Sequence, residues 1–446
     1  MASNERGRSA ERLRVLRQHL VVDDATPDYE GQGITHQPTS FNQDAVWEHI
    51  SEAPPDMILG ITEKWRADPN PKKLNLGVGA YRTEEGEPLV LDVVRKAEMS
   101  MVMDPKPNKE YLGIGGNPDL CRLSRQLAFG KSCPKIHREA IATVQSISGS
   151  GALRVGAGFL GKNYPVKVVY LPNPSWAPHQ PIFEAEDMEI RKYRYYHSGT
   201  RGLDFQGMME DLREALPGAI VVFHACAHNP TGVDPSMAQW EQMLRVVKSK
   251  KLLPFFDSAY QGFATGDLDI DAASIRLFAN ANVDMLLAQS YSKNLGLYGE
   301  RTGCLSVVCQ SASQAKRVES QLKAVIRPMY SNPPRHGAAI ASAVLGSPEL
   351  FEQWKVELRG MAGRIRSVRE KLHAALVQKG TPGDWTHILK QIGMFTFTGL
   401  SKEQVQYMTD KWHVYMMLNG RISMAGLSSK NCGYLADAID DAVRNV

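Results

Sequence analysis

One lysine stands where an apolar run, of the kind that forms a buried strand, comes to an end. Lys293 closes the segment SYSK (290–293) after the run 284–288, and Arg301 follows eight positions later. In such a positive neighbourhood the pKa of a lysine amine falls, and the neutral amine attacks aldehydes. Ser290, Ser292 and Arg301 are donors for a phosphate dianion. Because most lysines are solvated surface charges, it is the position of Lys293 that favours chemistry.

An acidic residue and two aromatic residues follow other apolar runs. Asp257 ends LPFFD (253–257), Tyr260 comes three residues later, and Trp176 lies in NPSWAPH (173–179). A reactive lysine of this kind suits the cofactor pyridoxal phosphate. The ring nitrogen of that cofactor needs an anion beneath it, which Asp257 would supply. Tyr260 would bond the ring hydroxyl, and Trp176 would stack on the ring. The alternatives are a helix cap or turn for the aspartate and core packing for both aromatic residues.

The segment QSISGSGALR (145–154) follows a probable strand and opens a helical pattern that ends near Leu160. Backbone N–H groups at the start of a helix bind phosphate, and glycines let the anion come close. Arg154 breaks the dinucleotide fingerprint G-x-G-x-x-G, and a glycine-rich turn without a ligand fits this pattern equally well. Ser148, Gly149 and Ser150 are therefore candidates for a phosphate site.

Short apolar runs alternate with helical patterns along the body of the chain. The runs are 166–171, 219–225, 253–256, 284–288 and 304–309. Since they are apolar throughout, we expect a largely parallel sheet that is covered on both faces and joined by right-handed crossovers. Ligands of such sheets bind beyond the carboxyl ends of the strands, and the segments 228–232, 257–260 and 290–293 lie there. A helix over 354–378 and the apolar segment 392–397 predict a second, smaller domain.

Several motifs, in this order, resemble the aspartate aminotransferase family from about residue 46 to the C-terminus. They are LGVGAYR (76–82), HACAHNPTGVDP (224–235), FDSAYQGFA (256–264), AQSYSKNLGLYGER (288–301), MYSNPP (329–334) and IGMFTFTGL (392–400). The resemblance implies an α/β protein of the pyridoxal-phosphate transferase fold type I. It has a large domain with a mostly parallel seven-stranded sheet flanked by helices, and a smaller α/β domain. We expect an N-terminal extension at 1–45, an arm and part of the small domain at 46–88, the large cofactor-binding domain at 89–355, and the rest of the small domain at 356–446.

The resemblance implies a role in cofactor binding for each matching residue. Lys293 would carry pyridoxal 5′-phosphate as a Schiff base and shuttle a proton, with Asp257 and Tyr260 as the other catalytic residues. The cofactor would be bound by Ser148, Gly149, Ser150, Trp176, His179, Asn229, Asp257, Tyr260, Ser290, Ser292, Lys293 and Arg301, and by Tyr111 from a second subunit. Family members commonly carry Thr at the position of Ser150, and the hydroxyl is kept.

The resemblance also implies a substrate with two carboxylates. Arg421 would clamp the α-carboxylate with a planar pair of bonds that lysine cannot copy, and Arg327 would reach the second carboxylate from the neighbouring subunit. The remaining substrate-binding positions are Gly79, Trp176, Asn229 and Phe395, with Val78 beside Gly79. The implied reaction is a ping-pong transfer from L-aspartate to 2-oxoglutarate that gives oxaloacetate and L-glutamate (EC 2.6.1.1), in a homodimer and without a metal. The bonds Asn173-Pro174 and Asn229-Pro230 match positions that are cis in the family.

Two alternatives to this reading stay open. An aromatic or broad-range aminotransferase would use the same cofactor residues with a looser side-chain pocket, and Arg327 argues against exclusive use of aromatic substrates. A binding or scaffolding protein of the same fold would normally have lost the lysine or the aspartate of the cofactor site, and this chain keeps both.

Bulk composition excludes several other classes of protein. The formal charge is +4 over 446 residues with scattered basic residues, so no nucleic-acid footprint is expected, and no apolar run reaches the length of a membrane span. The six cysteines form no C-x-x-C pair and are expected to be inert thiols in a reducing compartment.

The N-terminal extension contains a candidate targeting signal. Arg12, Leu13, His19 and Leu20 form R-L-x5-H-L, which resembles the type 2 peroxisomal signal, a receptor-read address that does not anchor the protein to a membrane. The alternatives are a mitochondrial presequence, because arginines and leucines recur in this segment, and a cytosolic tail. Acidic residues such as Glu5 weaken the mitochondrial reading.

Overall fold

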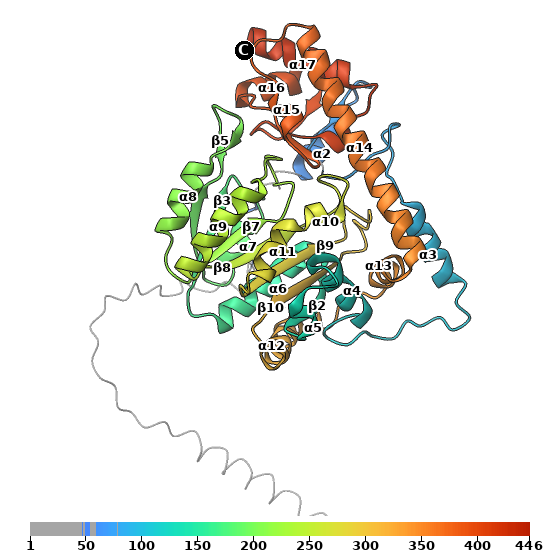
Figure 1. Cartoon of the computed structure of the whole chain (residues 1–446). Coiled ribbons are helices and arrows are strands. Elements are labelled where there is room, and N and C mark those ends of the chain that lie inside the picture. The colour runs from blue at the N-terminus through green and yellow to red at the C-terminus, as the bar shows by residue number, and fades with distance from the viewer. Residues whose placement is uncertain (1–46, 48–49, 54–58, 78) are drawn as a thin grey trace, which may run out of the picture. The chain divides into compact units, whose positions relative to one another are not determined.

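The computed structural model describes residues 47, 50–53, 59–77 and 79–446, of which residues from 59 onward belong to one compact unit. The R-L-x5-H-L segment and Val78 lie outside the described residues. Within the compact unit, a central sheet is flanked by helices, and α14 (Pro348–Gln378) leads to a group of helices near the C-terminus (Figure 1). The division of this unit into domains at residues 89 and 356 stays a prediction.

The central sheet has seven strands, and all but one run parallel. In spatial order they are β2 (Ile141–Ile147), β10 (Thr302–Val308), β9 (Met285–Ser290), β8 (Leu253–Ser258), β7 (Ile220–His224), β3 (Val168–Asn173) and β4 (Glu189–Arg194). Only β10 is antiparallel to its neighbours, β2 and β9. The sheet expected from the sequence is confirmed, because strands of continuous apolar residues are satisfied only between two covering layers.

Two separate apolar clusters cover the faces of this sheet. Phe255 of β8 packs into the cluster that includes α6 (Ser148–Asn163) and α12 (Ala312–Tyr330). Its neighbour Phe256 packs into the cluster on the other face, with α8 (Phe205–Glu214), α9 (Met237–Lys250) and α11 (Ala273–Asn280). Successive side chains of a strand point to opposite faces, so one apolar run serves both layers.

The remaining elements surround the sheet or build the C-terminal part. Near the start of the described chain and around the sheet lie α2 (Leu59–Ala67), α3 (Asp92–Val102), α4 (Pro118–Phe129), α5 (Pro134–His137), α7 (His179–Glu184), β5 (Tyr196–His197), β6 (Gly202–Leu203), α10 (Leu268–Asp271) and α13 (His336–Gly346). Later in the chain follow α15 (His387–Lys390), β11 (Phe395–Phe397), α16 (Lys402–Trp412), β12 (Val414–Tyr415), β13 (Arg421–Ser423), η2 (Met424–Gly426) and α17 (Cys432–Asn445).

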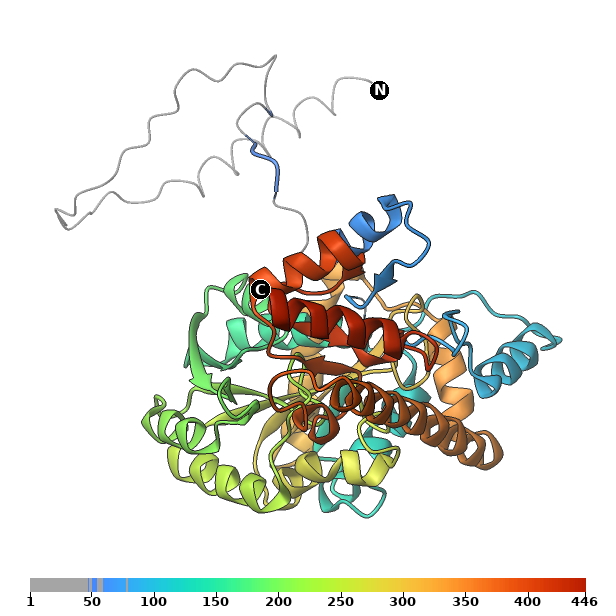
Figure 2. The same ribbon diagram turned by 90° about the horizontal axis from the view of Figure 1, so that it is seen from above.

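The C-terminal part is joined to an early segment of the chain by a parallel pair of short strands. β1 (Leu74–Asn75) pairs with β12, and β11 pairs antiparallel with β13. The helix α14 begins at Pro348, and the Ser347 hydroxyl caps it by accepting from the N–H of Leu350. Seen from above, α17 lies between α14 and α16 and packs against both (Figure 2).

The structure also shows the two predicted cis bonds, the state of the cysteines and the character of the helices. The bonds Asn173-Pro174 and Asn229-Pro230 are both cis, as predicted. All six cysteines are buried thiols outside any disulfide. Among the helices of the described residues, none has the length and apolarity needed to cross a bilayer.

Candidate active site

A cavity of about 380 Å³ lies where β7, β8 and β9 end. It is lined by Gly79, Ala80, Ser148, Gly149, Ser150, Leu153, Trp176, His224, Asn229, Asp257, Ala259, Tyr260, Ser290, Ser292, Lys293, Tyr298, Arg301, Phe395 and Arg421. The parallel strands bring these residues together because their carboxyl ends meet at one edge of the sheet. Most of the residues singled out in the sequence therefore border a single cavity.

Lys293 follows the end of β9 and faces the cavity. Burial, and secondly the positive charge of Arg301, lower the pKa of the Lys293 amine from 10.5 to about 8, although Asp257 acts in the opposite direction. The amine lies 5.4 Å from the ring centroid of Tyr298. A larger share of this amine is therefore neutral near pH 7 than for a surface lysine, which is the state that attacks a carbonyl.

Asp257 is the carboxylate at the end of β8, and a histidine supports it from behind. The Nε2 of His179 lies 3.0 Å from Asp257 Oδ2, and the Nδ1 of His179 lies 2.7 Å from the Ser175 hydroxyl. Burial acts to raise the pKa of Asp257, but the His179 bond and the positive charges nearby outweigh it, so the pKa is lowered. Asp257 is therefore held as an anion, as a pyridinium partner must be.

Hydroxyl groups and an arginine gather at the start of α6. Ser148, with a positive φ of 59°, lies with its hydroxyl 3.0 Å from that of Ser290 and 2.8 Å from that of Ser292. Arg301 donates to the Ser150 hydroxyl at 3.1 Å. No side chain caps the first N–H groups of α6. These donors together make an anion site at a helix start, where the helix dipole also favours negative charge.

The glycine at the second position of α6 keeps this cradle open. A Cβ built on Gly149 would stand 3.2 Å from the Cβ of Ser290, which is tighter than ordinary contact. A side chain at this position would push against Ser290 and crowd the anion site. Gly149 therefore leaves the room for an anion that was expected from the glycines of the segment 145–154.

A tyrosine, an asparagine and a tryptophan border the region between Asp257 and Lys293. Burial, and secondly the Asp257 carboxylate, raise the pKa of Tyr260, so its hydroxyl keeps its proton at neutral pH and can donate a hydrogen bond. Asn229 accepts from Arg421 Nη1 at 3.3 Å. Trp176 has an edge-to-face contact with His179, with ring centroids 5.3 Å apart.

Arg421 is a buried guanidinium with part of its hydrogen-bonding capacity unused. Its Nη2 donates to the carbonyl of Gly77 at 2.7 Å, whereas its Nε is buried without a partner among the described residues. The Phe395 ring lies under the guanidinium, 4.3 Å from ring centroid to Cζ. A Cβ on Gly79 would come within 2.9 Å of the same ring. An arginine held with open donors next to a glycine is suited to a planar carboxylate.

Three predicted residues do not line this cavity. Tyr111 is 84% exposed, and Arg327 lies on the outside of α12, where its Nη1 donates to the Ser331 hydroxyl at 2.6 Å. His179 does not line the cavity either, because it stands behind Asp257. The sequence assigns Tyr111 and Arg327 to the site of a second subunit, and that assignment stays a prediction.

Five cavity residues were not singled out in the sequence, namely Ala80, Leu153, His224, Ala259 and Tyr298. His224 ends β7, so the rule that pointed to Asp257 and Lys293 would have found it. The Tyr298 hydroxyl accepts from the N–H of Tyr81 at 2.9 Å, across 217 positions of sequence. Nothing in the local sequence signals a contact over such a separation.

The charges and hydrogen-bond donors that line the cavity fit pyridoxal phosphate. The donors at the start of α6 suit the phosphate, Lys293 suits the aldehyde, and Asp257 suits the ring nitrogen. The described residues contain no group of three or more His, Cys, Asp or Glu side chains that is arranged to hold a metal ion. The sheet and this site together define the class of enzymes that use an aldehyde cofactor bound to a lysine.

Comparison with known proteins identifies the family. The family model "Aminotransferase class I and II" matches residues 71–439. The chain belongs to this family. A relative from Oryza sativa subsp. japonica, "Aspartate aminotransferase, cytoplasmic", is 57% identical over 90% of this chain and 98% of its own length. Relatives at 51–57% identity carry the names of cytoplasmic, chloroplastic and mitochondrial forms.

Solved structures agree in fold over nearly the whole described chain. The aspartate aminotransferase from Saccharomyces cerevisiae cytoplasm has a TM-score of 0.88 and 41% identity, covering 90% of this chain and 99% of its own. The aromatic-amino-acid aminotransferase from Burkholderia pseudomallei, covalently bound to pyridoxal phosphate, has a TM-score of 0.87 and 43% identity over 89% of this chain and 99% of its own. The predicted fold class is therefore confirmed.

Proposed function

We propose that the protein is an aspartate aminotransferase that transfers the amino group of L-aspartate to 2-oxoglutarate, giving oxaloacetate and L-glutamate. The observation that carries this proposal is the placement, in one cavity, of a buried lysine with a lowered pKa, an anionic aspartate and a buried arginine with an open donor. Relatives named aspartate aminotransferase at 55–57% identity support it. The substrates are small amino acids and 2-oxo acids.

The residues at the start of α6 would hold the cofactor by its phosphate. Ser148, Ser150, Ser290 and Arg301 offer donors to the phosphate, and Gly149 leaves room for it. Trp176 would cover one face of the ring, and Asn229 with Tyr260 would bond the ring oxygen. When bound, pyridoxal phosphate supplies an aldehyde that condenses with amines and a ring that withdraws electrons from the substrate carbon.

The protein groups then supply charge and proton transfer. Asp257, with His179 behind it, has a lowered pKa and would therefore, as an anion, favour a proton on the ring nitrogen of a bound cofactor. With the cofactor bound, the Lys293 amine would take the proton from the substrate Cα and hold it for the second half of the transfer. Its pKa of about 8 suits both halves of this transfer near neutral pH.

Selectivity for substrates with two carboxylates would come from two arginines. Arg421 binds the α-carboxylate through its open donors, and the Phe395 ring fixes the plane of the guanidinium. Arg327 of the partner subunit would bind the second carboxylate, and Tyr111 of the partner subunit would reach the phosphate. This arrangement requires a homodimer whose two sites are shared.

Exposed apolar side chains around the end of α3 support such a homodimer. Met99, Val102 and Met103, around the end of α3, are 65%, 82% and 77% exposed, and Tyr111 is 84% exposed. A group of large apolar side chains left in water is unusual for a monomer and is typical of a surface that another chain covers. The molecular mass in solution, from analytical ultracentrifugation, would be that of two chains for the wild type.

The compartment is a separate proposal that rests on the N-terminal residues alone. R-L-x5-H-L at Arg12–Leu20 favours the peroxisome, and a cytoplasmic or mitochondrial location is compatible with the named forms of the relatives. A reporter fused to residues 1–45 tests it. Import into peroxisomes that survives Arg12→Ala with His19→Asp would contradict the peroxisomal signal.

The visible spectrum of the purified protein tests the activity directly. The wild type is expected to show an absorbance band of the bound cofactor that shifts on adding L-glutamate and shifts back on adding oxaloacetate. Lys293→Ala is the matched variant, and it should lose multiple turnover. A protein that ignores added pyridoxal phosphate, or an alanine variant that still turns over, would refute the proposed function.

A further inference from the structure

Arg364, in the middle of α14, is bonded to two chain segments that border the cavity. Its Nε donates to the Tyr81 hydroxyl at 2.6 Å, its Nη1 to the carbonyl of Leu427 at 2.8 Å, and its Nη2 to the carbonyls of Ala425, at 3.1 Å, and Arg82. The guanidinium also lies 4.5 Å from the centroid of the Tyr81 ring. Only an arginine presents enough donors in one plane for this set of acceptors.

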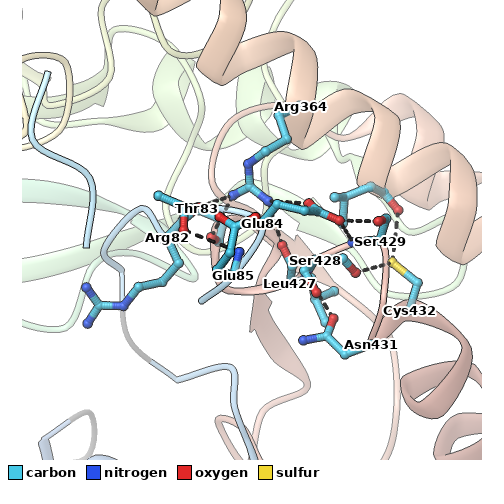
Figure 3. A network of polar contacts seen from close by, with 12 residues as sticks. Arg82, Thr83, Glu84, Glu85, Arg364, Leu427, Ser428, Ser429, Asn431 and Cys432 are labelled. Carbon is cyan, nitrogen blue, oxygen red and sulfur yellow. Dashed lines mark hydrogen bonds and ion pairs between the residues drawn. The ribbon is translucent and has the colours of Figure 1, made fainter. Parts of the chain in front are cut away.

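A carboxylate and a serine complete the contact between the same two segments. Glu84 accepts from the backbone N–H of Ser429 at 2.6 Å and also from the Ser429 hydroxyl, and its Oε2 lies 3.6 Å from Arg364 Nη1 (Figure 3). The Ser429 bonds, followed by the charge of Arg364, lower the pKa of Glu84 against the effect of its partial burial. Arg364, Glu84 and Ser429 are called the clasp below.

The clasp lies next to the two chain segments that would contact the substrate carboxylate, the one with Gly79 and the one with Arg421. Gly79 lines the cavity three residues before Arg82, and the N–H of Arg82 donates to the carbonyl of Ala425 at 3.1 Å. Arg421 lies in the strand that leads to Ala425, and its Nη2 donates to the carbonyl of Gly77 at 2.7 Å. A shift of one segment along the other therefore changes the position of Gly79 relative to the Arg421 guanidinium.

We propose that Arg364 is a positioning residue that determines how tightly the substrate carboxylate is bound, an inference that rests on the proposed function. The clasp holds the segment that carries Gly79 in register with Arg421. Arg364 is not among the residues that line the cavity, so it acts through its neighbours. Asp257 lies at the end of β8 and Lys293 just after β9, and among the described residues neither is hydrogen-bonded to the clasp. The effect of losing Arg364 therefore falls on substrate affinity and not on the proton transfer.

The test compares Arg364→Met with the wild type, both loaded with pyridoxal phosphate. We expect KM for aspartate and for 2-oxoglutarate to rise about tenfold or more, since small displacements of a binding group cost one to two orders of magnitude. The Kd of maleate, an unreactive dicarboxylate measured by calorimetry, should rise by a similar factor, while kcat stays within about threefold. Arg364→Lys keeps the positive charge but lacks the forked guanidinium, so its KM and maleate Kd should lie between those of Arg364→Met and the wild type.

Matched controls separate positioning from general destabilisation. Arg359→Met changes an exposed arginine of the same helix and should leave KM and the maleate Kd unchanged. If Arg364→Met does not fold, Tyr81→Phe removes one bond of the guanidinium and should raise KM by a smaller factor in the same direction.

Two results would overturn the proposal. One is a folded Arg364→Met protein, or Tyr81→Phe in its place, with KM and maleate Kd equal to those of the wild type. The other is a fall in kcat with KM unchanged, because this pattern marks a role in the chemical step. A wild type that neither transaminates aspartate nor binds maleate would instead refute the proposed function, so the two failures are distinguishable.

Discussion

The lowered pKa of Lys293 predicts that its amine is unusually reactive in the cofactor-free protein. With a pKa of about 8 instead of 10.5, about one tenth of the amine is neutral at pH 7, against about one part in 3000 for an ordinary lysine. The ratio is about 300-fold. Since only the neutral amine is nucleophilic, Lys293 should react with a small aldehyde up to about 300 times faster than an exposed lysine at the same pH.

Competitive labelling measures this difference within a single sample. The cofactor-free protein is treated with a limiting amount of formaldehyde and a mild hydride reductant, and the methylation of each lysine is followed by peptide mass spectrometry. Lys162, exposed near the end of α6, is the internal reference. The labelling rate of Lys293 should rise with pH to a midpoint near 8. A midpoint near 10, or a rate at pH 7 no greater than that of Lys162, would refute the assigned environment of the amine.

The lowered pKa of Lys293 also makes the stability of the cofactor-free protein depend on pH. The Lys293 amine keeps its proton up to about pH 10.5 in the unfolded chain, but only up to about pH 8 in the folded cofactor-free chain. The free-energy cost of burying the charged amine is therefore complete below pH 8, falls as the pH rises, and vanishes above pH 10.5. The cost corresponds to about 3 kcal/mol. Lys293→Met should therefore stabilise the cofactor-free protein at pH 7, and this gain, measured by urea unfolding, should shrink between pH 8 and 10.5. A gain that is independent of pH would contradict the calculation.

Three further predictions concern other parts of the site. Asp257→Asn removes the anion under the ring nitrogen and should lower kcat on the order of 100-fold in single-turnover kinetics, and an unchanged rate would contradict its role. Arg301→Gln removes a charged phosphate donor and should raise the dissociation constant of pyridoxal phosphate about 10-fold or more, as followed by absorbance titration. Arg327→Leu should reduce kcat/KM for aspartate about 100-fold with little effect on phenylalanine, since only aspartate has a second carboxylate. Unaltered aspartate turnover in that variant would exclude Arg327 from the shared site.

Five strands of the sheet were predictable because they coincide with continuous apolar runs, namely β3, β7, β8, β9 and β10, but their ends were not. The edge strand β4 is largely polar and exposed, and no predicted run covered it. The run 166–171 was expected as a strand, whereas β3 covers Val168–Asn173. Its last residues, Pro172 and Asn173, pair with Tyr193 and Arg194 of β4, and local preference gives no hint of this because proline and asparagine disfavour strands. Pairing partners, which lie elsewhere in the chain, decide where a strand stops.

The same limit applies to the site. Asp257 and Lys293 were predictable because a polar residue after a buried strand faces the edge of the sheet where ligands bind. Tyr298 and Arg364 were not, since their contacts with the segment around Tyr81 cross 217 and 283 positions. Groups that react carry a local signal, whereas groups that hold them in place are defined by the fold alone.

The cofactor residues and the substrate-binding residues are held by different parts of the fold. Lys293, Asp257 and the phosphate donors lie at or just after the ends of strands or in the first turn of α6, and so they are fixed by the sheet. Gly79, Phe395 and Arg421 belong instead to segments held by short strand pairs and by the clasp. Because these segments are held by short strand pairs and by side-chain bonds and lie outside the central sheet, they should adjust to the substrate while the cofactor residues stay still. Amide hydrogen exchange of the loaded enzyme with and without maleate checks this: protection should increase at residues 77–82 and 421–429 and remain unchanged in β8 and β9.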